Sequence, residues 1–173
     1  MRTAHTSQLD VATLEETRDL LYMVFDDMTD HDWEHALGGV HALVYDETEL
    51  VGHASLIQRR LLHRGRALRA GYVEGVAVRE DQRGLGHGAA MMEALEAVAR
   101  RAYDVAALGA TDEAAQFYAG RGWLRWLGPT FALTPRGIQR TPEDDGAVYA
   151  LSISTPLDVH GELTCDWRDG DVW

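Results

Sequence analysis

The sequence is poor in cysteine and has no long apolar run. A single cysteine, Cys165, among 173 residues excludes an intrachain disulfide. No apolar stretch approaches the roughly 18 residues that a membrane span needs, and the N-terminus lacks the basic-then-apolar order of a signal peptide. These absences predict a soluble, cytoplasmic protein with no membrane partner. The length predicts one domain, residues 1–173.

Positive charge is also scarce. The chain has 16 Lys and Arg residues against 28 Asp and Glu residues, which gives a formal net charge of −12. A field of this sign repels nucleic acid and anionic lipid, and it attracts polycations. The composition therefore predicts no nucleic-acid partner. It fits either a cationic substrate or an acidic surface that serves solubility alone.

Several catalytic patterns are missing as well. The glycine-rich stretch at residues 84–88 is not followed by the Gly-Lys-Ser/Thr of a P-loop, and it does not fit the Gly-x-Gly-x-x-Gly dinucleotide pattern. The histidines form no His-Glu-x-x-His run and there is no cysteine pair, so no metal site is expected. Ser55 and Cys165 lack the sequence surroundings of known nucleophiles, which disfavours covalent catalysis.

The most informative stretch that is present runs from Gly71 to Gly88. An apolar strand with one carboxylate, Glu74, leads into a glycine loop, and a helix of about residues 89–101 follows. Glycines in such a loop let backbone N–H groups approach a ligand closely, and the helix N-terminus adds partial positive charge. The stretch therefore predicts a binding site for an anionic group, although a glycine loop also serves simply to tighten a strand-to-helix turn.

Hydrophobic periodicity predicts elements on both sides of this stretch. A first helix is expected at about residues 13–26, starting at a capping box formed by Thr13 and Glu16. A short second helix is expected before Gly38-Gly39. Strands are expected at residues 2–8, 40–45, 50–57, 105–108 and 147–153. Another strand is expected between the turn at residues 64–65 and Val78, and a further helix after Thr111. The pattern predicts an α/β chain with one mixed sheet flanked by helices.

Two motifs, in this order, resemble a known superfamily. The pattern Arg83-x-x-Gly86-x-Gly88 after Val76-Ala-Val78 resembles the acetyl-CoA pyrophosphate loop of the GCN5-related N-acetyltransferases (GNAT), and residues 114–123 resemble their Phe-Tyr-x-x-x-Gly-Phe/Trp helix. The resemblance implies the GNAT acyl-CoA N-acyltransferase fold, a central mixed, mostly antiparallel sheet splayed at a bulge. It also implies acetyl-CoA as a cosubstrate, without a metal. The implied coenzyme-binding residues are Val76, Val78, Arg83, Gly84, Gly86, Gly88 and Ala89.

Acetyl transfer to an amine requires a neutral amine, stabilisation of the developing oxyanion and a proton for the departing thiolate. Glu74 lies in an apolar strand beside Gly75, and glycine within a strand often marks a bulge that redirects its neighbours. We expect Glu74 to act as a base through water, with the backbone N–H near Val76 as oxyanion donor. The alternative is a carboxylate that faces solvent or a structural arginine. Tyr118 matches the position of the superfamily's acid, and this match favours a general acid over the alternative of a core-packing tyrosine.

A closer resemblance covers nearly the whole chain. Residues 32–43, 71–79, 140–146 and 165–173 together resemble the aminoglycoside 2'-N-acetyltransferases, most specifically in the terminal Asp-Gly-Asp-Val-Trp. This resemblance implies that the acceptor amine is bound by Asp32, Glu74, Asp144, Asp171 and the terminal carboxylate of Trp173. A carboxylate-lined pocket suits a substrate with several ammonium groups. The alternative for the tail is fraying, which its two tryptophans argue against.

The sequence therefore predicts acetyl-CoA-dependent acetylation of the 2'-amine of aminoglycosides, by direct transfer in a ternary complex. Glu74, Tyr118 and Trp173 are the expected catalytic residues, and either Glu74 through water or the Trp173 carboxylate is the base. Related proteins suggest a homodimer. Two alternatives stay open: another cationic acceptor, such as a polyamine or a protein amino terminus, and a non-catalytic acyl-CoA sensor.

Overall fold

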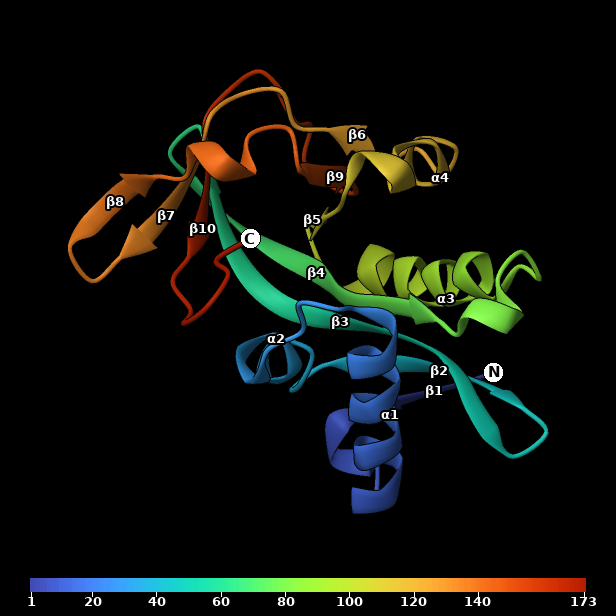
Figure 1. The fold of residues 1–173 in the computed structure, drawn as a ribbon. Coiled ribbons are helices and arrows are strands. Elements are labelled where there is room, and N and C mark those ends of the chain that lie inside the picture. The colour runs from blue at the N-terminus through green and yellow to red at the C-terminus, as the bar shows by residue number, and fades with distance from the viewer. The chain divides into compact units, whose positions relative to one another are not determined.

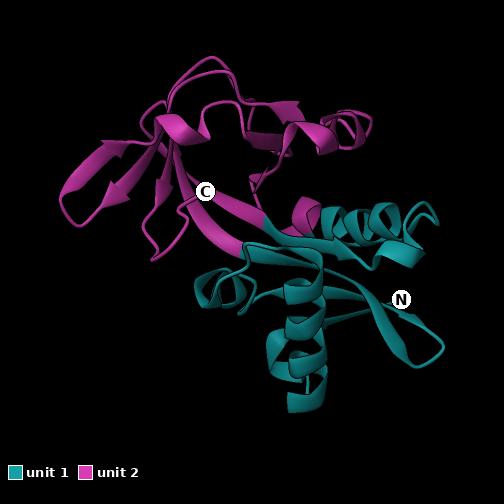
Figure 2. Ribbon diagram, viewed as in Figure 1, with its two compact units in different colours: residues 1–57, 73–98 teal, residues 58–72, 99–173 magenta.

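The computed structural model describes residues 1–173, which form two compact units (Figure 2). Unit 1 contains residues 1–57 and 73–98, and unit 2 contains residues 58–72 and 99–173. Strands β3 (Glu49–His63) and β4 (Arg66–Val78) and helix α3 (His87–Ala102) each contribute residues to both units. No helix is both long enough and apolar enough to cross a membrane.

Unit 1 is built on antiparallel strands with helices on both faces (Figure 1). Strand β1 pairs with β2, and β2 pairs with the first part of β3. Leu21 of α1 lies beside β4 at Gly75, and Met91 of α3 lies beside β3 at Gly52. The remaining elements of the unit are β1 (Arg2–His5), η1 (Thr6–Gln8), α1 (Val11–Val24), α2 (Asp30–His35), β2 (Val40–Asp46) and η2 (Glu80–Gln82).

The start of α1 differs from the sequence prediction. The N-cap is Asp10, whose carboxylate accepts a hydrogen bond from the Thr13 backbone N–H at 2.9 Å, so the capping box predicted at Thr13 and Glu16 is wrong. The helix begins earlier because an aspartate satisfies the exposed N–H groups of its first turn directly. The second helix does carry a capping box, formed by Thr29 and Asp32.

Unit 2 contains the part of the chain in which the sequence pattern is weakest. Its strands follow the order β6-β9-β5-β4-β3-β10-β7-β8, in which β4–β5 and β10–β7 are parallel pairs. The pairing of β4 with β5 covers three residue pairs only and ends at Tyr72 and Ala107. Its other elements are β5 (Val105–Gly109), η3 (Asp112–Ala114), α4 (Ala115–Ala119), β6 (Leu124–Arg125), β7 (Thr130–Thr134), β8 (Gly137–Arg140), η4 (Pro142–Asp144), β9 (Val148–Ser152) and β10 (Leu163–Asp166).

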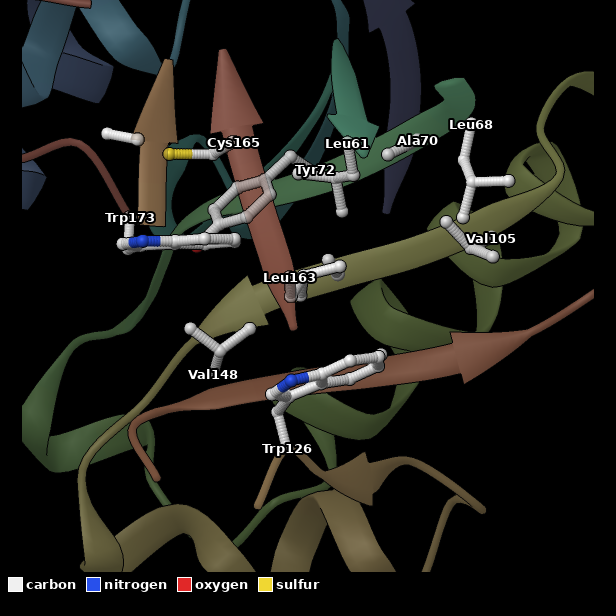
Figure 3. Close-up of a cluster of buried hydrophobic side chains, with 13 residues drawn as sticks. Leu61, Leu68, Ala70, Tyr72, Val105, Trp126, Val148, Leu163, Cys165 and Trp173 are labelled. Atoms are coloured by element: carbon white, nitrogen blue, oxygen red, sulfur yellow. The ribbon is translucent and has the colours of Figure 1, made fainter. Parts of the chain in front are cut away.

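A buried cluster holds unit 2 together (Figure 3). Leu61 and Leu68 from the β3–β4 hairpin pack with Leu163 and Cys165 of β10 and with Trp126, which is fully buried. Trp173 belongs to the same cluster, and its indole lies beside the ring of Tyr72. The tail is therefore part of a hydrophobic core, which argues against the fraying considered from the sequence.

The predicted mixed sheet flanked by helices is confirmed. Strands were expected at the positions of β1 to β5 and β9, and helices at those of α1 to α4. Four strands were not anticipated, namely β6, β7, β8 and β10. They are at most five residues long, and all but the β7–β8 hairpin pair with segments distant in sequence, so local periodicity carries little information about them.

Candidate active site

In unit 1, strand β4 is distorted at Gly75, beside the predicted base. Gly75 has φ of 56°, in the left-handed region, and its carbonyl accepts a hydrogen bond from His53 Nδ1 at 2.9 Å. The flanking residues Glu74 and Val76 are partly buried. The conformation agrees with the bulge expected from a glycine within this strand, and it determines where Glu74 and the Val76 N–H point.

Replacing Gly75 with alanine should destabilise the protein by about 2 kcal/mol, since an L-residue is strained at positive φ and the new Cβ would lie 3.3 Å from Leu21 Cδ2. The matched control is Gly84→Ala, where φ is 78° but nothing lies within 4 Å of the new Cβ. Urea unfolding of both variants provides the measurement. Equal losses of unfolding free energy at the two positions would contradict the role given to crowding at Gly75.

The loop after β4 is fixed at its start by Arg79. The Arg79 guanidinium donates to Asp81 at 2.6 and 2.9 Å and to Glu49 at 2.8 Å, and these hydrogen bonds raise its pKa. Its backbone N–H donates to the Val51 carbonyl at 2.9 Å. Arg79 therefore ties the loop to β3. Next along the loop, Arg83 Nε donates to the Val78 carbonyl at 3.2 Å.

The predicted coenzyme-binding residues lie along one segment of unit 1, with Val76 and Val78 at the end of β4 and the others in the loop and the first turn of α3. Gly84 and Gly86 have φ of 78° and 86°, which only glycine adopts without strain. The Ala90 N–H donates to the Gly86 carbonyl, so the preceding N–H groups of His87, Gly88 and Ala89 have no acceptor within α3. These groups, at the positive end of a 16-residue helix, form an anion site beside Arg83.

A pocket of about 710 Å³ adjoins this loop within unit 1. Arg83 and Arg79 line it together with the acidic side chains of residues 80 and 81, and the end of α1 forms its other side. The lining residues are Met23, Val24, Asp26, Arg79, Glu80, Asp81 and Arg83. The space beside the loop is therefore large enough for part of a nucleotide-sized ligand.

In unit 2, Tyr118 lies on the short helix α4 and is 5% exposed. Its ring packs against Trp123 at 6.1 Å and Tyr149 at 5.8 Å between centroids. Burial raises the pKa of Tyr118 to about 12, so the hydroxyl keeps its proton at neutral pH. The residue is thus both a packing residue and a proton-bearing donor.

The C-terminal residue Trp173 is held by side chains from several elements of unit 2. Its indole Nε1 donates to Thr141 Oγ1 at 3.0 Å, and Arg168 Nη2 donates to an oxygen of the terminal carboxylate at 3.0 Å. Arg59, which is 4% exposed, donates to the carbonyl of the preceding residue, Val172, at 2.8 Å. The terminal carboxylate of Trp173 lies beside Gly109, at the end of β5. A Cβ added at Gly109 would be 3.7 Å from the carboxylate carbon.

Two of the predicted acceptor carboxylates, Asp144 and Asp171, lie near this tail. Asp171 Oδ1 accepts the Trp173 N–H at 3.1 Å, and the Asp144 N–H donates to the carbonyl of Thr141. Burial, and then the charge of Asp171, raises the pKa of Asp144 to about 6. The adjacent Asp145 differs, since hydrogen bonds from Arg140 lower its pKa to about 2. Asp144 is therefore a carboxylate in acidic surroundings, as in a site for a cation.

Asp32, the remaining predicted acceptor residue, lies in unit 1 on α2. Its Oδ2 accepts hydrogen bonds from the Thr29 N–H at 2.8 Å and the Thr29 hydroxyl at 2.7 Å. These bonds give Asp32 a structural role as a helix cap, whereas Asp144, Asp171 and Trp173 lie together in unit 2. Both of these hydrogen bonds are accepted by Oδ2 of Asp32, and neither by its Oδ1.

Three residues that fix the tail were missed in the sequence, namely Arg59, Arg168 and Thr141. Only Arg168 had a local signal, as a cation within the acidic terminal segment. Cys165 also contributes, since its Sγ donates to the Val172 carbonyl at 3.3 Å. Burial raises the pKa of this thiol to about 11, which keeps it protonated and agrees with the expected absence of a cysteine nucleophile.

A distorted strand with a carboxylate, a glycine loop that opens a helix, and a separate group of carboxylates are features that suit a coenzyme-dependent acyltransferase. The sequence profile of the acetyltransferase (GNAT) family matches residues 8–123, and the chain belongs to this family. It is 52% identical over 177 residues to an aminoglycoside 2'-N-acetyltransferase from Mycolicibacterium fortuitum, with 99% of this chain and 91% of that protein covered.

Solved structures show the same fold at low sequence identity. Escherichia coli ElaA has a TM-score of 0.60 and 22% identity, with 87% of this chain and 97% of that chain covered. An acyl-CoA N-acyltransferase from Pseudomonas aeruginosa has a TM-score of 0.62 and 15% identity, with the same coverage of 87% and 97%. The GNAT fold expected from the two motifs is thereby confirmed.

Proposed function

We propose that this acetyltransferase acetylates the 2'-amine of aminoglycoside antibiotics with acetyl-CoA, by direct transfer in a ternary complex. The observation that carries the proposal is 52% identity, over 99% of the chain, to an enzyme named for that reaction. The neighbouring carboxylates Asp144 and Asp171 support it independently, because burial and the charge of Asp171 raise the pKa of Asp144, which suits a site where a substrate ammonium would compensate the negative charge.

The coenzyme would be held within unit 1. Backbone groups of Val76 and Val78 are the proposed partners of the pantetheine arm, while Arg83 and the N–H groups from Gly84 to Ala89 would bind its pyrophosphate. The two glycines at positive φ and the free N–H groups of the first turn of α3 favour this assignment. Arg79 is already engaged by Glu49 and Asp81, which leaves Arg83 as the better cation for phosphate.

The proposed chemistry removes two protons from the substrate ammonium and supplies one to the departing sulfur. Glu74, through water, or the Trp173 carboxylate takes the first proton, and the nitrogen then attacks the thioester carbonyl. The Val76 N–H stabilises the oxyanion, the attacking nitrogen loses its second proton to solvent, and the C–S bond breaks as the thiolate leaves. Tyr118 donates its hydroxyl proton toward that sulfur, for which a phenol that stays protonated is suited.

Replacing Tyr118 with phenylalanine should lower kcat about 10²-fold, the size of a general-acid contribution, with little change in KM. Tyr149→Phe is the matched control, since the Tyr149 hydroxyl is buried without a hydrogen-bond partner and its removal should leave kcat unchanged. Steady-state kinetics of both variants provide the comparison. An unaltered kcat in the Tyr118 variant would remove it as the acid.

Replacing Asp144 with asparagine should stabilise the free protein and weaken substrate binding. The folded-state pKa of about 6 lies above the ordinary value of 3.8, so this carboxyl costs stability as the pH rises from 3.8 to about 6. We expect a gain of about 1 kcal/mol in unfolding free energy at neutral pH, none well below the ordinary pKa, and about a tenfold higher KM for the amine. A variant that gains no stability and keeps its KM would contradict this role.

The quaternary structure and location belong to the same proposal. We expect a cytoplasmic homodimer in which both units of each chain form one acetyltransferase domain. Strand β8 is at the edge of its sheet, and its Ile138 pairs in register with Leu133 of β7, with both side chains exposed. An edge strand with an exposed apolar pair of this kind favours pairing with another chain. Sedimentation velocity would measure the mass in solution.

The experiment that tests the function measures thiol release from acetyl-CoA with gentamicin, which has a 2'-amine, and with kanamycin A, which has a hydroxyl there. Turnover with gentamicin alone would support both the reaction and its regiochemistry. Turnover with spermidine but with neither drug would point to a polyamine acceptor. Acetyl-CoA binding without turnover of any amine would favour the sensor alternative.

A further inference from the structure

Two histidines of unit 1, His41 and His53, form a buried hydrogen-bonded pair that the proposed chemistry does not use. Both are 0% exposed, and they come from neighbouring strands, β2 and β3. In the strand register His41 is opposite Ser55 and His53 is opposite Leu43, so the two rings are diagonal neighbours. His41 Nδ1 lies 2.9 Å from His53 Nε2.

The pair belongs to a longer chain of hydrogen bonds. At one end, His53 Nδ1 contacts the carbonyl oxygen of Gly75 at 2.9 Å. At the other end, His41 Nε2 contacts the Thr6 hydroxyl at 2.8 Å, and that hydroxyl also accepts the Gly38 N–H at 2.8 Å. The chain therefore joins the β1 region and the turn before β2 to the distorted residue of β4.

When both rings are neutral, only one arrangement of protons fits the chain, and the Thr6 hydroxyl then donates to His41 Nε2 at 2.8 Å and not to the more distant Gly39 carbonyl at 3.3 Å. The Gly75 carbonyl can only accept, so His53 Nδ1 carries the proton and its Nε2 is an acceptor. His41 Nδ1 must then donate to His53, which leaves His41 Nε2 to accept from the Thr6 hydroxyl. Both rings are neutral Nδ1–H tautomers, and all donors point toward Gly75.

The surroundings keep both rings in this state. Burial, and then the neighbouring histidine, lowers the pKa of His53 to about 3, and burial lowers the pKa of His41 to about 4. Neither ring takes up a proton near neutral pH, so the direction of the chain does not change. A backbone carbonyl passes no proton onward, so the chain is a fixed positioning device and no proton relay.

We propose that His53, held by His41 and Thr6, is a positioning residue for acetyl transfer. By holding the Gly75 carbonyl it fixes the left-handed conformation at Gly75, and thereby the directions of Glu74 and the Val76 N–H. Loss of the bulge would turn neighbouring side chains to the other face of the strand. This role rests on the proposed function, in which Glu74 is a base and Val76 an oxyanion donor.

Two polar substitutions of His53 separate positioning from core filling. In His53→Asn the amide nitrogen takes the place of Nδ1 and can still donate to Gly75. In His53→Gln the amide reaches the place of Nε2, toward His41, and the contact with Gly75 is lost. A misplacement of about 1 Å costs on the order of 10²-fold in rate, so we expect kcat to fall about 10²-fold in the Gln variant and less than about fivefold in the Asn variant.

The two variants should differ in kcat while the acetyl-CoA Kd of each stays within about threefold of the parent value, because the loop and Val78 are unchanged. Thermal unfolding midpoints show whether the two variants are equally folded. Equal kcat losses in both variants, or a kcat loss that follows the unfolding midpoint, would overturn the proposal.

A second measurement requires neither a variant nor an acceptor. Heteronuclear NMR of the imidazole nitrogens in the free parent protein should show Nδ1–H tautomers for both His41 and His53. An Nε2–H tautomer of His53 would overturn the proposal, because Nδ1 could not then donate to Gly75. Failure of the proposed function would instead show as a parent protein that acetylates no 2'-amine, with the tautomers still as expected.

Discussion

Removing Trp173 should lower kcat/KM for the amine about 10³-fold, in the range of a lost acid–base group, while acetyl-CoA binding is largely kept. The deletion removes the terminal carboxylate from its place beside Gly109 and takes a buried indole from the core of unit 2. We therefore also expect a loss of about 3 kcal/mol in unfolding free energy. Acetyl-CoA should still bind, because its proposed residues lie in unit 1. Thiol-release kinetics and calorimetric titration provide the two measurements.

Two further variants separate the carboxylate from the indole. Trp173→Phe retains the terminal carboxylate but loses the hydrogen bond to Thr141, and we expect most of the activity to remain. A single glycine added after Trp173 retains the indole but displaces the carboxylate by about 3.5 Å, and it should be nearly as inactive as the deletion. A fully active extended protein would rule out the carboxylate and leave Trp173 with a packing role only.

Replacing Glu74 with glutamine should lower kcat about 10³-fold at neutral pH, because the variant cannot take a proton from the ammonium. The substitution preserves shape and the conformation at Gly75, so the acetyl-CoA Kd should change little. Because the base is then missing, the pH dependence of kcat/KM should also differ between the variant and the parent. A pH series of kcat/KM for the parent and the variant provides the measurement.

Glu93→Gln is a suitable control for Glu74→Gln, since Glu93 is an exposed residue of α3 and its loss changes the net charge equally. It should keep the activity of the parent protein. If the Glu74 variant also keeps its kcat, Glu74 is excluded and the Trp173 carboxylate is the remaining candidate base. If the terminal carboxylate is also dispensable, the amine must lose its proton to solvent.

The sequence was most informative where function constrains the backbone. Gly75 was expected to distort a strand and Gly84 and Gly86 to form a turn, and each has the positive φ that made glycine necessary. The Asp10 cap was missed because Thr13 and Glu16 offered an equally good local pattern three residues later. Local patterns of this kind cannot show which of two adjacent caps the tertiary structure selects.

Long-range partners were beyond the reach of sequence patterns. Nothing near Arg59 indicates that it pairs with Asp166, 107 positions later, at 2.8 Å. The His41–His53 pair was considered only as a possible metal pattern and dismissed, since the strand register that joins the rings depends on pairing of β2 with β3. The sequence proposes a set of site residues, which stays a prediction, but it could not show the groups that hold those residues in place.

The part played by β10 and Trp173 in the core of unit 2 has a consequence for biosynthesis. Leu61, Leu68 and Tyr72 are translated early, yet they become buried together with Leu163, Cys165 and Trp173. During synthesis the β3–β4 hairpin must therefore wait, with apolar side chains uncovered, until the last strand has left the ribosome. We expect nascent chains that end before β10 to bind chaperones strongly, and folding of unit 2 to be slow because its contacts are distant in sequence.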